Sequence, residues 1–191
     1  MTLPVQAAAS PGTLQIRDGE RILTFSYEEL LAAHGGEMPG GVALVFRLMQ
    51  WLFHDAADDI PERRTCSFYS GLGENGKGII DGAEYVMRVV RGRTLFLDAA
   101  RCAGKNAPPA PGGGKYYFEL GFNQKLYAIS VRENVIPREF WDFSRYAHQK
   151  RGAGEPLLPQ ERERLRMLRE QLAAAILAAP AGALFSLLEI S

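Results

Sequence analysis

The chain has 191 residues, which is enough for one domain with a hydrophobic core and too few for two ordinary domains. Hydrophobic residues make up 47% of the sequence, so the composition excludes a wholly disordered chain. Lysine plus arginine and aspartate plus glutamate number 22 each. This zero net charge gives no general attraction to nucleic acid or to an anionic membrane, and we expect neither as a partner.

The chain has two cysteines, Cys66 and Cys102, too few for a disulfide scaffold. Residues 1–11 lack the basic segment of a secretory signal, and no stretch reaches the ~20 apolar residues that span a bilayer. We therefore expect a cytoplasmic protein in which both cysteines are thiols. A net charge near zero protects little against self-association, which favours an oligomer.

Residues 1–25 are expected to form an N-terminal extension with one short strand, at Leu14–Ile16 or Arg21–Phe25. A helix is predicted to begin at Ser26, because Ser26 and Glu29 have the spacing of a capping box. This helix should end before Gly35.

A second helix is predicted over Gly41–His54, where apolar residues recur every three or four positions. This periodicity is typical of a buried central helix. Pro39 and Gly40 lie at its start, where free backbone N–H groups and the helix dipole favour an anion or a thiolate. The turn from His34 to Gly41 is therefore the first candidate for a functional site.

A strand at Thr65–Tyr69 leads into a second glycine-rich segment, Gly71–Gly78. Glycine N–H groups beside Lys77 would suit a phosphate, but no Walker A pattern follows, and a mobile surface turn is the interpretation we favour. The next helix is predicted to begin at Asp81, which has capping-box spacing to Glu84.

The rest of the chain is predicted to form a strand, a loop, a hairpin, two helices and a last strand. These segments are Thr94–Asp98, Ala99–Gly114, Tyr116–Leu120 with Leu126–Val131, Pro137–Tyr146, Pro159–Ala179 and Leu184–Ile190. A linker is expected at Arg151–Pro156. Helices and strands mix without regular βαβ alternation, which favours an α+β fold with a mixed or antiparallel sheet against helices. We expect a core over 26–150, with 151–191 packing on this core or on a dimer partner.

Two single residues, Cys102 and His34, and one charged segment also need interpretation. Cys102 lies between Arg101 and Lys105, which could lower its pKa, although an ordinary loop cysteine is the interpretation we favour. His34 could act as a ligand or a general base. Arg162–Glu170 alternates positive and negative charges, which indicates a solvated helix face.

The pattern His34-Gly-Gly-Glu-Met-Pro-Gly40, followed by an amphipathic helix, resembles the His-Gly-His-x-Cys-Pro-Gly motif of the FmdE-like family. This family is named for the E protein of formylmethanofuran dehydrogenase operons. Asp81–Glu84 and Arg91–Thr94 resemble its Cys-x-x-Asp-(Ala/Gly)-x-Gln and Thr-Gly-Cys-Thr pair. Lys115 before an aromatic strand and the segment Ala179–Phe185 add two further similarities.

The resemblance implies an α+β core, a homodimer and a His/Cys cleft that binds metal, with an association to molybdenum or tungsten formylmethanofuran dehydrogenase systems. This sequence departs from the motifs at the expected donors. Gly36 replaces the second histidine, and Met38, Gly78 and Arg93 stand where the family has cysteines. Of the matched donors only His34 remains, whereas a transition-metal site needs three or four.

Two interpretations follow from these departures. In the one we favour, Arg93 replaces the metal, and a cleft between His34 and Arg93 binds a small anionic ligand. Lys77 and Lys115 could contact this ligand, and Asp81 and Thr94 could orient it. The protein would then be non-catalytic or weakly catalytic.

In the alternative, the Ala99–Gly114 loop brings Cys102 to His34. Zinc or another divalent transition metal would be held there, completed by Asp81 or water, in a metal-dependent enzyme. A third hypothesis is a scaffold or interaction module that uses the apolar segments Leu172–Leu177 and Leu184–Ile190.

Overall fold

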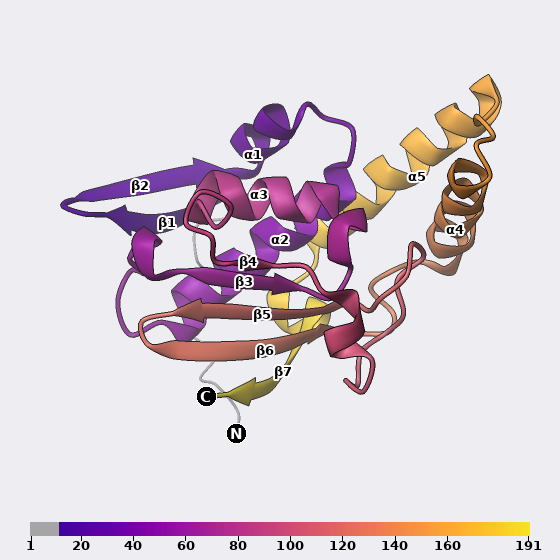
Figure 1. Cartoon of the computed structure of the whole chain (residues 1–191). Helices are drawn as coiled ribbons and strands as arrows, with labels where there is room; N and C mark the ends of the chain where they lie inside the picture. Colours follow the sequence, from indigo (N-terminus) through magenta and orange to yellow (C-terminus); the bar gives the residue numbers. More distant parts are fainter. Residues whose placement is uncertain (1–11) are drawn as a thin grey trace.

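The computed structural model describes residues 12–191 and has a mixed α+β architecture (Figure 1). The strands are β1 (Thr13–Asp18), β2 (Arg21–Ser26), β3 (Ser67–Ser70), β4 (Leu95–Phe96), β5 (Tyr117–Phe122), β6 (Lys125–Val131) and β7 (Phe185–Ile190). The α-helices are α1 (Tyr27–His34), α2 (Pro39–Trp51), α3 (Lys77–Met87), α4 (Arg138–Gly152), α5 (Pro159–Ala178) and α6 (Ala181–Leu184). The predicted α+β class is confirmed, and residues 1–11 of the expected extension lie outside the described part.

Five strands form one sheet in the order β4-β3-β5-β6-β7, in which β3 and β4 are parallel and the other neighbours are antiparallel. The predicted hairpin is confirmed as β5 and β6. Its turn is tighter than expected, because only Asn123 and Gln124 connect the strands, with φ of 49° and 61°. Left-handed conformation at both positions is the signature of a type I′ turn.

The N-terminal segment contains both candidate strands, which pair as the antiparallel hairpin β1–β2. Leu14 and Ile16 of β1 are fully buried in the main core, so this part of the expected extension belongs to the fold. The capping box at α1 is confirmed. Glu29 N–H donates to Ser26 Oγ at 3.3 Å, and Ser26 N–H donates to Glu29 Oε2 at 2.7 Å.

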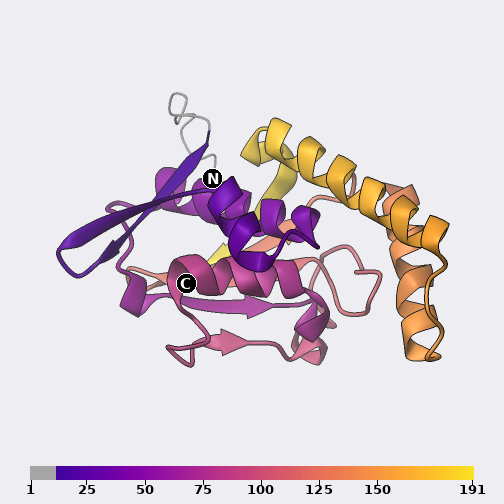
Figure 2. The same cartoon turned by 90° about the horizontal axis from the view of Figure 1, so that it is seen from above.

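The predicted central helix is confirmed as α2, which a π-helical turn (Leu52–Ala56) extends. It is almost wholly buried and contacts α1, α3 and α5 (Figure 2). The predicted start of the next helix is wrong, because α3 begins at Lys77, after Gly76, rather than at Asp81. The Asp81 carboxylate does not cap α3; it lies in the second turn and bonds to other side chains.

Two antiparallel helices, α4 and α5, extend beyond the end of the sheet (Figure 1). Ion pairs from Lys150 to Glu161 at 3.3 Å and from Arg164 to Glu139 at 3.1 Å join them. α4 is longer than predicted and takes up the start of the expected linker. The second half of α5 packs on α2, and β7 pairs with β6, so 151–191 packs on the core. Within residues 12–191, no helix is long and apolar enough to cross a membrane.

Candidate functional site

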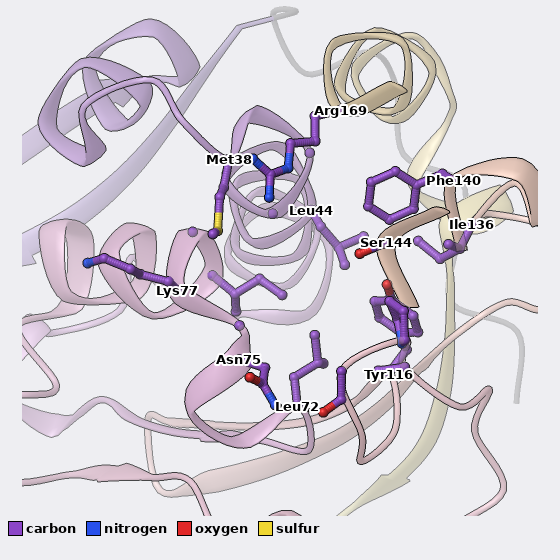
Figure 3. A pocket seen from close by; sticks show the side chains of 18 of the residues that line it. Met38, Leu44, Leu72, Asn75, Lys77, Tyr116, Ile136, Phe140, Ser144 and Arg169 are labelled. Atoms are coloured by element: carbon purple, nitrogen blue, oxygen red, sulfur yellow. Dashed lines mark hydrogen bonds between the residues drawn. The ribbon is translucent and has the colours of Figure 1, made fainter. Parts of the chain in front are cut away.

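A pocket with a cavity volume of about 100 Å³ lies where α2 and α3 begin (Figure 3). Five stretches of the chain contribute lining residues, within 38–44, 72–79, 110–116, 136–151 and 169–176. They include the starts of α2 and α3, the Gly71–Gly78 turn, the Ala110–Gly113 loop, and the facing sides of α4 and α5. The two glycine-rich segments that the sequence analysis singled out separately therefore meet at one pocket.

The starts of the two helices lie in backbone contact because glycines face each other. A Cβ on Gly78 would lie 2.9 Å from the Met38 carbonyl oxygen, and one on Gly41 would lie 3.4 Å from the Ile79 nitrogen. Neither helix has a side chain that caps its first N–H groups. Two helix N-termini, each with partial positive charge, therefore border the same cavity. Gly71, Gly73, Gly76 and Gly78 are buried, so the preferred interpretation of Gly71–Gly78 as a surface turn is wrong.

The lining of this pocket contains basic residues and no aspartate or glutamate, although the whole chain has equal numbers of acidic and basic residues. The basic residues of the lining are Lys77, His148, Arg151 and Arg169. Among the described residues, no carboxylate lies within 4.0 Å of Arg151 or Arg169. Lys77 is exposed and turns its Nζ toward Asp81, at 3.0 Å, on the outer side of α3. The positive charge of the pocket thus comes mainly from the two arginines, and the charge of Glu37 offsets that of Arg169 only in part.

Arg169 reaches from α5 toward Met38 at the start of α2 (Figure 3). Its guanidinium makes one hydrogen bond, donating from Nη1 to the Glu37 carbonyl oxygen at 3.2 Å. Burial, and then the positive charge of Arg151, lower the pKa of Arg169. The remaining N–H groups of this half-buried side chain are available to an acceptor in the pocket.

His148 lies on α4 beside the same two arginines. Burial first, and then Arg151 and Arg169, lower its pKa from the ordinary value, so its imidazole is neutral at pH 7. The Gly112 backbone lies against the ring, since a Cβ there would be 3.0 Å from His148 Nε2. Asn75 fixes this loop by donating to the Gly112 carbonyl oxygen at 2.7 Å.

His34, Asp81 and Lys77 are brought together beside the pocket, not in it. The His34 side chain is 1% exposed, and its Nδ1 lies 2.7 Å from Asp81 Oδ2. Its Nε2 is buried and has no hydrogen-bond partner among the described residues. Burial opposes ionisation of Asp81, but hydrogen bonds from His34 and Lys77 outweigh it and lower the Asp81 pKa.

The structure does not bring Arg93 to His34. Asp81, the partner of His34, precedes the end of α3 by six residues, about 9 Å along the axis. Arg93 lies beyond that end, where its N–H donates to the Val90 carbonyl oxygen at 3.1 Å. Thr94 lines a different pocket, in which three arginines surround Asp18. The expected cleft between His34 and Arg93 is therefore not formed in this structure.

Cys102 does not approach His34 either, because the sheet separates them. Its buried side chain packs with Tyr69 and Tyr117 on one face of the sheet. Phe68 and Phe118, the residues that precede and follow them in β3 and β5, belong to the main core on the helix side of the sheet. His34 lies on the helix side. Among residues 12–191, no group of three or more His, Cys, Asp or Glu side chains could hold a metal ion. The rebuilt metal site expected from these two residues is not formed.

Lys115 lies at the edge of the 99–114 loop, outside the pocket. Its Nζ donates to the Lys105 carbonyl oxygen at 2.6 Å. Of the residues predicted to bind an anion, only Lys77 lines the pocket.

The sequence analysis missed His148, Arg151 and Arg169, all in the α4–α5 hairpin. Arg169 was assigned to a solvated face of alternating charge. The available signal was its position beside the apolar stripe Leu165, Leu168, Leu172 and Ile176, which places it at the border of the buried face.

No protein-family model matches this sequence, and the comparison with curated proteins finds no match.

Proposed function

We propose that this chain is an FmdE-like protein that binds a small anionic ligand in the pocket at the starts of α2 and α3. The observation that carries the proposal is the composition of the lining, which has three cationic side chains (Lys77, Arg151 and Arg169), a neutral histidine and no carboxylate. In a protein with equal numbers of acidic and basic residues, such segregation of charge in a half-enclosed, partly apolar site favours an anion.

The ligand's charge would lie between Arg169 and the uncapped N-termini of the two helices. A guanidinium and several backbone N–H groups supply donors in the geometry that carboxylates and phosphates accept. Arg151 adds charge at the exposed rim. Burial first, and then repulsion by Arg151, lower the pKa of Arg169, and a bound anion would offset both effects.

The FmdE-like assignment is supported by one juxtaposition. Met38 and Gly78 stand where the family's motifs have cysteines, and a Cβ on Gly78 would lie 3.1 Å from Met38 Cβ. His34 precedes Met38 by four residues. These positions would surround a metal in a relative with the full set of donors, so we propose that this chain keeps the shape of that region and uses charge in place of metal. The homodimer and the association with formylmethanofuran dehydrogenase systems belong to the same proposal.

Calorimetric titration with inorganic phosphate and with acetate, at constant ionic strength, tests anion binding. We expect one saturable site per chain and a loss of affinity of roughly tenfold or more in Arg169→Gln, since a hydrogen bond to a charged group is removed. Arg162→Gln is the matched control, because Arg162 is exposed on the same helix and does not line the pocket. Equal binding by both variants, or no binding by the unmodified chain, would refute the proposal.

A further inference from the structure

The interior of the pocket is mostly apolar, in contrast to its basic rim, and the buried Ser144 adds one hydroxyl on the α4 side. Leu44, Tyr116, Leu172 and Ile176 are almost fully buried and form its base, and Ile136 and Phe140 close the side formed by α4 (Figure 3). An inorganic anion would leave this surface in contact with water. The lining is therefore complementary to a ligand that has an apolar part as well as a charge.

The pocket offers one partly buried cation. Lys77 is exposed and paired with Asp81, Arg151 is exposed, and the lowered pKa of His148 keeps its imidazole neutral at pH 7. Arg169 alone combines a permanent charge with partial burial beside the apolar wall. A planar guanidinium fits a planar carboxylate with two parallel hydrogen bonds.

We infer that the ligand is a short-chain monocarboxylate whose carboxylate meets Arg169 and whose hydrocarbon part enters the apolar base. This inference rests on the proposed anion-binding function and specifies the chemical class for the same site. A second negative charge would find no second partly buried cationic side chain among the described residues of the lining, because Arg151 and Lys77 are both exposed.

The cavity limits the length of the hydrocarbon part. An apolar cavity of about 150 Å³ holds benzene, which has six carbons, so by the same measure a cavity of about 100 Å³ holds roughly four carbons. The best straight-chain ligand should be butyrate or pentanoate. Phe140 sets this limit on the α4 side, and shortening it to alanine should admit a longer chain.

The experiment is a calorimetric series of straight-chain carboxylates from acetate to octanoate, with inorganic phosphate and 1-butanol as reference ligands. We expect affinity to rise about fourfold with each methylene through butyrate or pentanoate and then to stop rising. Phosphate and the uncharged alcohol should bind more weakly than butyrate. Arg169→Gln should weaken every carboxylate, while Arg162→Gln leaves the series unchanged. In Phe140→Ala the maximum should move to a longer chain.

The outcomes distinguish a failure of the monocarboxylate inference from a failure of the proposed anion binding. Affinity that depends on Arg169 but is independent of chain length, or that is highest for phosphate, overturns the monocarboxylate and leaves anion binding intact. Binding of 1-butanol as tight as that of butyrate also overturns it. Absence of any binding that depends on Arg169 overturns both. If Phe140→Ala does not fold, the length series on the unmodified chain still decides the ligand class.

Discussion

Substitution of Gly82 by alanine should destabilise the protein through a single side-chain collision. Gly82 lies one turn after Gly78 on the face of α3 that packs against α2. A Cβ on it would lie 2.5 Å from Val45 Cγ1, and Val45 is 1% exposed. Val45 is β-branched and has one preferred rotamer in a helix, so it cannot rotate away without strain. Overpacking costs about 1–3 kcal/mol, and the gain in helix propensity from glycine to alanine returns about 1 kcal/mol. We expect a net loss of about 1 kcal/mol.

The same substitution should become stabilising when Val45 is alanine. Val45→Ala alone costs about 2 kcal/mol, because two methyl groups leave the core. In that background the alanine at 82 fills vacated space and keeps its helix-propensity gain of about 1 kcal/mol. Urea unfolding of all four proteins gives the coupling energy, which should be about 2 kcal/mol. Destabilisation of equal size in both backgrounds would refute the packing argument.

Three further predictions concern single residues. The pKa of His148 is lowered in the folded chain, so between that pKa and about 6.5 the unfolded chain binds more protons at His148 than the folded chain does. The contribution of His148 to stability is therefore full above about pH 6.5 and is lost as the pH falls. His148→Gln should flatten this part of the stability–pH curve in urea unfolding, and an unchanged slope would contradict the lowered pKa. Gln124→Gly should raise the unfolding temperature, because Gln124 has φ of 61° beside Asn123 and glycine adopts this conformation without strain; a lower midpoint would argue against the type I′ turn. Ser26→Ala should cost about 1 kcal/mol in urea unfolding by removing the acceptor for the Glu29 N–H, whereas the exposed Ser191→Ala serves as a neutral control.

The fold was predictable to the extent that it follows from local periodicity. The three- and four-residue spacing of apolar side chains in α2 identifies this helix correctly, because burial of a helix face requires that pattern. The hairpin β5–β6 was also identified, although nearly all of its residues are buried on both faces of the sheet and their burial does not alternate. The start of α3 was missed for a local reason. Asp81 and Glu84 have capping-box spacing, but the helix begins one turn earlier, where the buried Gly76 and Gly78 allow the backbone to approach α2.

The candidate site was only half predictable. Both glycine-rich turns were identified from their composition, but nothing local in either turn indicates that they touch. The basic residues that complete the pocket come from α4 and α5, more than 60 residues further along the chain than Gly78. Arg169 alternates with acidic neighbours, a pattern typical of a solvated face. Leu172 packs against Gly40, where a Cβ would lie 2.9 Å from Leu172 Cδ2, and this contact brings the face of α5 that carries Arg169 to the start of α2.

The absence of a carboxylate from this lining opposes folding and so favours a role in binding. Partial burial removes water from Arg169, and Arg151 repels its charge. The charge of Glu37 offsets this in part but forms no ion pair with Arg169. If the arginines served stability alone, an acidic residue among them would be the simplest improvement, and the rest of the chain pairs many of its charges in that way. A ligand that brings the missing negative charge reverses the balance, since anything that binds only the folded state stabilises it. The electrostatic conflict in the unliganded pocket and the proposed affinity for anions therefore have one physical origin.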